Sequence, residues 1–388
     1  MKIDGKTLDE YQEKAVENAL KMPLSIINGG AGRGKTTIIK AIAEGHGGNV
    51  TLCAFSGKAA ARIKEATGIP ASTIHRMLGY IGTEFLVKSL ERQNVIIDEA
   101  SMLSSSLLYE IISRNPNTLT LIGDEAQLPP VGDGQPFHDI VHFRPDLVTT
   151  LEKCYRASGA VFDASEMLRR GEMPPAYSCN GGESWRICQT GGAESTHRYI
   201  VEMVRGGALD FSQDIILVPR NEGEHASVDG LNDAIVQIVN PHGEGERFKP
   251  GDRVLNTKNN SDLDIWNGTT ATVAAVSRSG ELTIMVDGSD DYKDVPADFA
   301  RDNFRLAYAL TVHKAQGSQY RRVVFVCLAR DIFALLDRPM VYTAVTRAKE
   351  ACLVVGEYGA LVSALQKRNT KHTVIQRLAE MEVENAGI

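Results

Sequence analysis

Short runs of consecutive apolar residues recur along this 388-residue chain. Runs without clean alternation of apolar and polar residues are typical of strands buried on both faces of a parallel sheet. The runs predicted as strands lie at residues 24–28, 50–55, 95–97, 119–122, 215–218, 323–328 and 352–355. Helical patterns at residues 36–44 and 57–67 separate the early runs. Strands and helices in alternation predict an α/β, doubly wound fold.

The spacing of these strands predicts two lobes with an insertion. Residues 244–298 break the pattern, because they are rich in Gly, Asp, Asn and Thr and contain alternating segments at 269–276 and 281–286. Such a stretch predicts a small β-barrel inserted into the second lobe. The expected lobes are residues 1–150 for the first, and residues 151–243 and 299–388 for the second.

Composition narrows the class of protein. The chain is 43% hydrophobic and 23% charged, which is ordinary for a globular protein with a sizeable core. The longest apolar run, residues 323–329, is shorter than the roughly 20 residues that cross a bilayer, and the N-terminus lacks the apolar core of a signal peptide. We therefore expect a cytoplasmic protein with no membrane contact. The net charge of −7 argues against an overall basic protein but is compatible with a local basic groove.

Residues 29–36 read Gly-Gly-Ala-Gly-Arg-Gly-Lys-Thr and fit the phosphate-loop pattern G-x-x-x-x-G-K-[ST] between an apolar run and a helical pattern. Glycines let backbone N–H groups curl around phosphate oxygens, and the helix N-terminus adds a positive dipole end. Lys35 is expected to reach the β- and γ-phosphates, and Thr36 to bind Mg²⁺. A glycine-rich turn that contains Lys-Thr by chance is the alternative. The expected ATP-binding residues here are Gly30, Gly32, Gly34, Lys35, Thr36 and Thr37.

A second apolar run ends in two carboxylates, Asp98 and Glu99. Asp98 suits the Mg²⁺ shell, and Glu99 suits a base that deprotonates the attacking water. Small-molecule kinases of this fold need the aspartate, but only hydrolases need the glutamate. A helix-capping acidic pair is the alternative.

Three further segments carry a family resemblance. Residues 123–132 read Gly-Asp-Glu-Ala-Gln-Leu-Pro-Pro-Val-Gly, residues 309–318 read Ala-Leu-Thr-Val-His-Lys-Ala-Gln-Gly-Ser, and residues 341–349 read Val-Tyr-Thr-Ala-Val-Thr-Arg-Ala-Lys. With the phosphate loop, these resemble the ordered motifs of superfamily 1 DNA helicases, in particular the RecD-like branch that includes the small phage Dda-like helicases. The resemblance implies two RecA-like P-loop lobes with parallel sheets, ATP in the cleft between them, and single-stranded DNA across their tops.

The resemblance also implies roles for single residues. Gln12 resembles the residue that reads the adenine edge, with a solvated helix face as the alternative. Gln127 resembles the γ-phosphate sensor. Arg156 and Arg347 resemble two arginines from the second lobe, a role worth about 10³–10⁵ in rate in GTPases. For both arginines, the alternative is a surface ion pair.

The expected DNA contacts lie in both lobes. Hydroxyl, amine and imidazole groups would donate to backbone phosphates. By resemblance they are Phe55, Ser56, Lys58, Thr73 and His75 in the first lobe, and Thr311 and His313 in the second. Gln316 would couple the two sites. The alternative for each histidine is a core or surface residue, and for Phe55 plain core.

Two insertions also match the family. Residues 244–298 resemble its SH3-like β-barrel, where Trp266 would stack on a base unless it is a core residue of the barrel. Residues 79–92 lie where the family has a short hairpin that splits the duplex. Phe85 would be its apolar wedge, and a simple buried aromatic is the alternative. The chain departs from the family at Ala31 and Arg33, where Pro and Thr are usual, and at Gln319, where an acidic residue is common.

These features predict an ATP-dependent DNA helicase that uses ATP and Mg²⁺, moves 5′ to 3′ on single-stranded DNA and unwinds duplex junctions. A monomeric, self-contained motor is expected, working in DNA replication, repair or recombination beside proteins of those processes. Three alternatives stay open at this point. They are a nucleic-acid-dependent ATPase that translocates or remodels without strand separation, a P-loop kinase, and an ATP-switched binding protein.

Overall fold

The computed structural model divides into two compact units, Met1–Ala157 with Asn369–Ile388, and Ser158–Arg368. It describes residues 2–3, 5–82, 84–155, 159–243, 245–260, 262–288, 292–367, 373 and 376–377. Each unit contains a six-stranded sheet, and the second unit also contains a five-stranded sheet.

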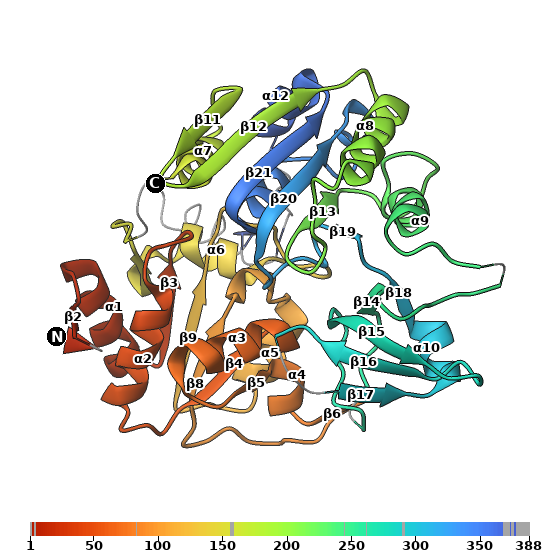
Figure 1. Ribbon diagram of the computed structural model, residues 1–388. Helices are drawn as coiled ribbons and strands as arrows, with labels where there is room; N and C mark the ends of the chain where they lie inside the picture. Colours follow the sequence, from red (N-terminus) through yellow and green to blue (C-terminus); the bar gives the residue numbers. More distant parts are fainter. Residues whose placement is uncertain are drawn as a thin grey trace. The chain divides into compact units, whose positions relative to one another are not determined.

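The sheet of the first unit is parallel throughout and has the strand order β10-β3-β9-β8-β4-β5 (Figure 1). Its strands are β3 (Leu24–Asn28), β4 (Thr51–Ala54), β5 (Ala71–Thr73), β8 (Asn94–Asp98), β9 (Thr118–Gly123) and β10 (Val148–Thr150). The four predicted strands are therefore confirmed. The two that the apolar pattern missed, β5 and β10, are short edge strands with few apolar residues.

Helices cover both faces of this sheet, which is why its strands are apolar on both sides. Ile26 and Ile27 are adjacent on β3 and fully buried in different clusters. Ile27 packs with α1, α2 and α3, and Ile26 packs with α5 and α6. The helices are α1 (Glu10–Lys21), α2 (Lys35–Gly45), α3 (Gly57–Thr67), α4 (Ile74–Met77), α5 (Ser105–Ile112) and α6 (Pro136–Phe143), with the 3₁₀ helices η1 (Ala100–Met102) and η2 (Pro145–Leu147). Two small antiparallel pairs complete the unit: β1 (Lys2–Ile3) with β2 (Lys6–Thr7), and β6 (Tyr80–Ile81) with β7 (Glu84–Phe85).

The six-stranded sheet of the second unit has the order β11-β12-β21-β20-β13-β19. It is parallel except for the pair β11–β12. Its strands are β11 (Tyr177–Asn180), β12 (Glu183–Gln189), β13 (Ile215–Val218), β19 (Ala309–Thr311), β20 (Tyr320–Cys327) and β21 (Ala348–Gly356). The three predicted strands are confirmed as β13, β20 and β21. The pattern missed β11 and β12 because polar residues interrupt them.

The helices of the second unit are α7 (Ala160–Arg170), α8 (Ala193–Arg205), α9 (Val228–Val239), α11 (Arg338–Val345) and α12 (Tyr358–Gln366), with the 3₁₀ helix η3 (Ala329–Asp331). Of residues 373–384, where the sequence predicts a last helix, only 373 and 376–377 are described.

A separate antiparallel sheet lies between α9 and β19 in the chain, in the order β17-β16-β15-β14-β18. It consists of β14 (Arg253–Asn256), β15 (Thr270–Val276), β16 (Leu282–Val286), β17 (Tyr292–Val295) and β18 (Phe304–Leu306), with helix α10 (Ala297–Asn303). The sheet has an apolar core of its own, which includes Val254, Ile284 and Phe304. Its last strand lies beyond residue 298, where the sequence pattern placed the end of the insertion.

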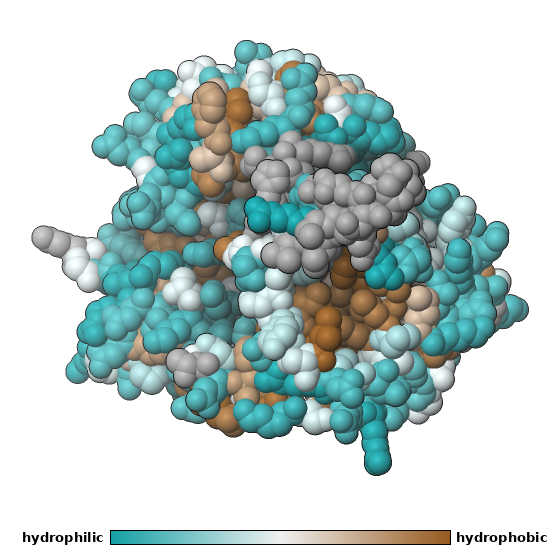
Figure 2. All heavy atoms as spheres, turned by 180° about the vertical axis from the view of Figure 1, so that it is seen from behind, coloured by the Kyte–Doolittle hydropathy of each residue, from teal (hydrophilic) through white to brown (hydrophobic). Residues whose placement is uncertain are grey.

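Hydrophilic residues cover most of the face that Figure 2 shows, in keeping with the 23% of charged residues in the chain. None of the helices in the described ranges is both long and apolar enough to cross a membrane.

Candidate nucleotide site and nucleic-acid contacts

The phosphate loop, the acidic pair and Gln127 all follow strands of the first sheet at its carboxyl edge. The parallel register pairs Asn28 at the end of β3 with Gly123 at the end of β9. The N–H of Gly29 donates to the carbonyl of Gly123 at 2.9 Å, and the Asn28 amide oxygen accepts from the N–H of Glu125 at 3.1 Å. Ligands of open parallel sheets bind at this edge. The fold therefore gathers three predicted motifs at one place within one unit.

The phosphate loop leads directly into α2. Gly34, immediately before the helix, has φ +78°, and a Cβ added there would lie 2.5 Å from Nε2 of Gln12. The positive φ favours glycine at this position, and a larger residue would also displace the Gln12 amide. The Lys35 ammonium donates to the carbonyl of Gly29 at 2.8 Å, which places it across the loop. Thr36 and Thr37 lie in the first turn of α2, where the N–H of Thr37 donates to the carbonyl of Gly34 at 3.0 Å.

Arg33 joins the phosphate loop to the segment after β10. Its guanidinium donates to the carbonyls of Leu151 at 2.5 Å and Glu152 at 2.8 Å. A second contact joins the same two segments, in which the carbonyl of Gly32 accepts from the N–H of Tyr155 at 2.9 Å. The sequence analysis assigned no role to Arg33. The structure gives it one, a clamp between two segments far apart in the chain.

Gln12 belongs to the same corner of the site. Its side chain is 3% exposed and forms a reciprocal capping box with Asp9 at the start of α1. The Tyr155 hydroxyl donates to Gln12 Oε1 at 3.2 Å and also to the Asp9 carboxylate. Burial and this contact with Asp9 raise the pKa of Tyr155 to about 12, so the hydroxyl stays a donor at neutral pH. The solvated-face alternative for Gln12 is wrong, while its role at the adenine stays a prediction.

The acidic pair is buried. Asp98 ends β8 and is 7% exposed, and Glu99 is 6% exposed. Glu99 has φ +55°, an uncommon conformation for a residue with a side chain, and its N–H donates to Asp98 Oδ1 at 2.9 Å. Burial raises the pKa of Asp98, as does the charge of Glu99, whereas the nearby charge of Lys35 lowers it. Two buried carboxylates beside one ammonium form an environment that favours a further cation.

Gln127 follows β9 and is 4% exposed. Its N–H donates to the carbonyl of Asp124 at 3.1 Å, and its side-chain amide lies 3.5 Å from the Asp124 carboxylate. The carbonyl of Gln127 lies 3.4 Å from Nε2 of His138 at the start of α6. The turn is therefore held on both sides, and Gln127 has a defined place at the sheet edge.

The predicted DNA contacts of the first unit lie on two neighbouring strand ends. Because β4 pairs with β5 in parallel, Ala54 lies opposite Thr73, and the segments that follow both strands emerge together. Ser56 and Thr73 begin α3 and α4, and their hydroxyl oxygens each accept a helix N–H at 3.2 Å. A hydroxyl that accepts in a cap still has its own hydrogen to donate. Lys58 lies in the first turn of α3, and Phe55 is half-buried against the core.

The hairpin β6–β7 packs beside His75. The His75 ring lies 5.4 Å from the ring of Tyr80 and 6.2 Å from that of Phe85, and burial lowers the pKa of His75. Phe85 is half-buried against the core, with the Arg114 guanidinium 5.6 Å from its ring centre. Ile81, at the turn, is 64% exposed. The wedge role of Phe85 stays a prediction, and the hairpin exposes a different apolar side chain.

The two motifs of the second unit come together through Arg347, which is 3% exposed. Its guanidinium donates to the carbonyl of Thr343 at 3.1 Å and to that of Ser318 at 3.3 Å. Thr311 ends β19, and its hydroxyl accepts from the N–H of Lys314 at 3.4 Å, while His313 is half-buried. The surface ion pair considered for Arg347 is inconsistent with this burial. Arg156 lies outside the described residues.

Trp266 lies in the loop between β14 and β15. Its ring is half-buried, and its indole N–H donates to Asp264 at 3.2 Å. The core cluster of the five-stranded sheet does not include it. The barrel-core alternative for Trp266 is therefore not supported, and stacking on a base stays a prediction.

Comparisons with known proteins point to helicases. A family model described as an AAA domain matches residues 7–182, and one described as a UvrD-like helicase C-terminal domain matches residues 306–355. The chain is 33% identical to the ATP-dependent RecD2 DNA helicase of Deinococcus radiodurans over 95% of its own length, and spans about half, 52%, of that protein. It is 27% identical to the RecBCD enzyme subunit RecD of Mycolicibacterium smegmatis, covering 95% of this chain and 74% of the other.

The fold also resembles solved structures. A structure of Pif1 helicases at forked double-stranded DNA matches with a TM-score of 0.58, at 17% identity and 98% coverage of both chains. A structure of Pif1 from Bacteroides with ADP-AlF3 and single-stranded DNA matches with a TM-score of 0.53, at 17% identity and 98% coverage of both. At this identity the likeness concerns the fold, an α/β architecture with parallel-sheet lobes.

Proposed function

Because the chain belongs to the RecD-like helicases of superfamily 1, we propose that it is an ATP-dependent DNA helicase that translocates on single-stranded DNA and unwinds duplex. One observation carries the proposal. A single sheet edge of the first unit holds the phosphate loop and the buried Asp98–Glu99 pair, and the same sheet ends in the Ser56 and Thr73 donors. A nucleotide site and a phosphate-binding strip on one sheet are what a DNA-driven ATPase needs. Movement from 5′ to 3′ is part of the proposal and rests on the family.

ATP would bind with its phosphates on the loop, where Lys35 and the N–H groups at the start of α2 meet them. Glu99 would take a proton from the attacking water, and Gln127 would contact the γ-phosphate. The donor set of Thr36 and Asp98 fits Mg²⁺, which prefers oxygen ligands and would neutralise charge on the β- and γ-phosphates. The raised pKa of Asp98 supports this, because a bound cation offsets the cost of burying that carboxylate.

The second unit would complete the site with arginine. Arg347, held by Thr343 and Ser318, presents a fixed cation that would stabilise charge on the transferring phosphoryl group. Arg156 would act beside it. Hydrolysis removes the phosphoryl partner of both arginines, so the grip of the units on DNA would alternate with the nucleotide state. Separating one base-pair step costs roughly 1–2 kcal/mol, and an apolar wedge on the hairpin would prevent re-pairing.

The domain assignment is part of the same proposal. Each six-stranded sheet with its helices would be one RecA-like lobe, and the five-stranded sheet with α10 would be an SH3-like barrel, supported by its antiparallel order and separate core. We expect the protein to act in the cytoplasm as a monomeric motor on single strands and duplex junctions, in replication, repair or recombination.

Unwinding of tailed duplexes tests the proposal. With ATP, Mg²⁺ and a trapping strand, the protein is expected to release the strand from a 5′-tailed duplex and not from a 3′-tailed one, and the Lys35→Ala variant to release neither. ATP turnover without strand release would favour a translocase that does not unwind. A slow ATPase that single-stranded DNA does not stimulate would favour an ATP-switched binding protein, and phosphate transfer to a small acceptor would favour a kinase.

A further inference from the structure

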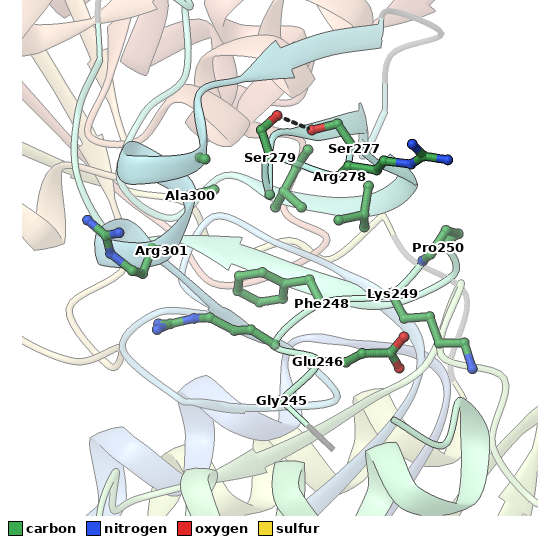
Figure 3. A pocket seen from close by; sticks show the side chains of 15 residues that line it. Gly245, Glu246, Phe248, Lys249, Pro250, Ser277, Arg278, Ser279, Ala300 and Arg301 are labelled. Carbon is green, nitrogen blue, oxygen red and sulfur yellow. Dashed lines mark hydrogen bonds between the residues drawn. The ribbon is translucent and has the colours of Figure 1, made fainter. Parts of the chain in front are cut away.

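A cavity of about 630 Å³ opens at one end of the five-stranded sheet. It lies among the segment 245–250 before β14, the turn 276–280 between β15 and β16, and the helix α10 (Figure 3). Its floor is apolar, with Phe248, Val276 and Leu282 among the lining side chains. None of the predicted ATP or DNA contacts lies in this lining, so the cavity needs an explanation of its own.

The rim of the cavity is basic. Four of the fifteen lining residues, Arg247, Lys249, Arg278 and Arg301, are cations, and Glu246 is the single anion. In Figure 3, Arg301 lies on one side of the Phe248 ring, and Arg278 and Lys249 lie on the other side with their charged ends directed outward. This concentration of positive charge stands out in a chain whose net charge is −7. A site with an apolar floor and a cationic rim suits an anionic ligand that also carries an apolar group.

Two of the four cations, Arg247 and Arg278, form no direct ion pair with the residues that the structure describes. Within the part of the chain that the structure describes, no hydrogen bond or ion pair engages the guanidinium of Arg247 or Arg278. The Arg247 guanidinium lies over the Phe248 ring, 5.5 Å from its centre. Burial lowers the pKa of Arg247, as do the neighbouring charges of Arg305 and Arg301, whereas the charge of Asp302 raises it. An anionic ligand would relieve this repulsion between like charges.

The position of the cavity separates it from the predicted DNA contact of the same sheet. Strand β14 runs from the cavity to the Trp266 loop, and β15 runs back from that loop to the cavity. The seven residues of β15 span about 20 Å, so the cavity and Trp266 lie at opposite ends of one hairpin. A DNA strand stacked on Trp266 would therefore leave the cavity open to another molecule.

From these observations we propose that the cavity binds an acidic peptide segment of a partner protein, with one apolar side chain of that segment on the Phe248 floor and its carboxylates on Arg247 and Arg278. A polynucleotide fits less well. Its phosphates are evenly spaced along a groove, whereas this site is a concave cavity with an apolar floor. The proposal is independent of the helicase function, because the peptide site shares no residue with the ATP site.

Binding of a labelled synthetic peptide to the full chain, measured by fluorescence anisotropy, tests the proposal. The peptide carries Asp and Glu on both sides of one Phe, and a second peptide replaces that Phe by Ser. We expect the Phe peptide to bind more tightly than the Ser peptide. Arg278 lies on an exposed turn where the fold tolerates change. Arg278→Glu is expected to lower the affinity for the Phe peptide by about tenfold.

The matched control is Arg198→Glu, an equal charge reversal on the exposed face of α8 in the same unit, which is expected to leave peptide binding unchanged. Absence of peptide binding, or equal losses in the two variants, would overturn the proposal. Equal affinity for the Phe and Ser peptides would contradict the proposed contact between the peptide Phe and the apolar floor of the cavity. Competition by oligothymidylate, with loss of oligothymidylate binding in Arg278→Glu, would assign the cavity to nucleic acid instead.

Discussion

The two six-stranded sheets have the same layered α/β architecture but carry opposite charges in their functional loops. The first sheet ends in buried carboxylates, Asp98 and Glu99, next to a glycine-rich loop. The second has no such loop among its described residues, and the buried group to which we assign a proposed function is the cation Arg347. The layered fold therefore repeats while the charged groups differ, because the carboxylates lie where β8 ends, whereas Arg347 lies between α11 and β21.

The difference has a physical basis in how each charge is held. The carboxylates are held by a strained backbone, with Glu99 at φ +55°, and by their neighbour Lys35. The Arg347 guanidinium is held by the main-chain carbonyls of Thr343 and Ser318. We therefore propose binding and proton transfer for the groups of the first unit, and stabilisation of phosphate charge for Arg347 of the second.

The largest expected effect concerns Arg347, the charged group of the second unit in this comparison. Arg347→Ala is expected to lower DNA-stimulated ATP turnover by about 10³–10⁵-fold, because it removes the cation of the second unit. Binding of a fluorescent ATP analogue, which the first unit governs, should persist. Thermal unfolding identifies any loss of folding, and Arg186→Ala, an exposed arginine on β12, is the control. Unchanged turnover in Arg347→Ala would contradict the assignment.

Glu99→Gln tests the role of the buried carboxylates in the first unit. The amide has the same shape but takes up no proton, so we expect ATP binding to be kept and steady-state hydrolysis to fall by about 10²–10⁴-fold. Glu91→Gln, at an exposed position before β8, is the matched control. An unaltered hydrolysis rate for Glu99→Gln would exclude the role of base.

Two variants of the β6–β7 hairpin compare an exposed apolar side chain, Ile81, with a half-buried one, Phe85. Ile81→Ser is expected to lower unwinding several-fold while changing stability by less than about 0.5 kcal/mol, because the side chain is 64% exposed. Phe85→Ala is expected to lower the free energy of unfolding by about 1–3 kcal/mol, because its ring packs on the core. Strand release and single-strand-stimulated ATPase are measured for both. If Phe85→Ala alone impaired unwinding at unchanged stability, Phe85 would be the wedge.

The smallest expected effect concerns Arg33. Arg33→Ala is expected to raise the KM for ATP roughly three- to tenfold at little cost in kcat, because the loop loses its bonds to Leu151 and Glu152. Arg144→Ala, which removes an exposed pair with Asp146 in the same unit, provides the comparison. A KM equal to that of the unaltered protein would mean that the phosphate loop holds its shape without the clamp.

Much of the fold could be predicted because seven strands are apolar on both faces, a pattern that burial by helices imposes on each. The strands that escaped prediction, such as β5 and β12, are short or interrupted by polar residues, and their pairing is decided by neighbours far away in the chain. The phosphate loop and the acidic pair could be located from spacing alone. The clamp formed by Arg33 could not, because its acceptors are main-chain carbonyls more than a hundred residues away.

That clamp has a consequence for how the chain leaves the first unit. Residues 151–155 are the last described before the boundary at Ala157, and the phosphate loop grips them through Arg33 and through the carbonyl of Gly32. If the phosphate loop rearranges around a nucleotide, residues 151–155 must move with it or lose their hydrogen bonds to Arg33 and Gly32. Binding of a nucleotide would in this way change how firmly the first unit holds one of the two places where the chain passes between the units.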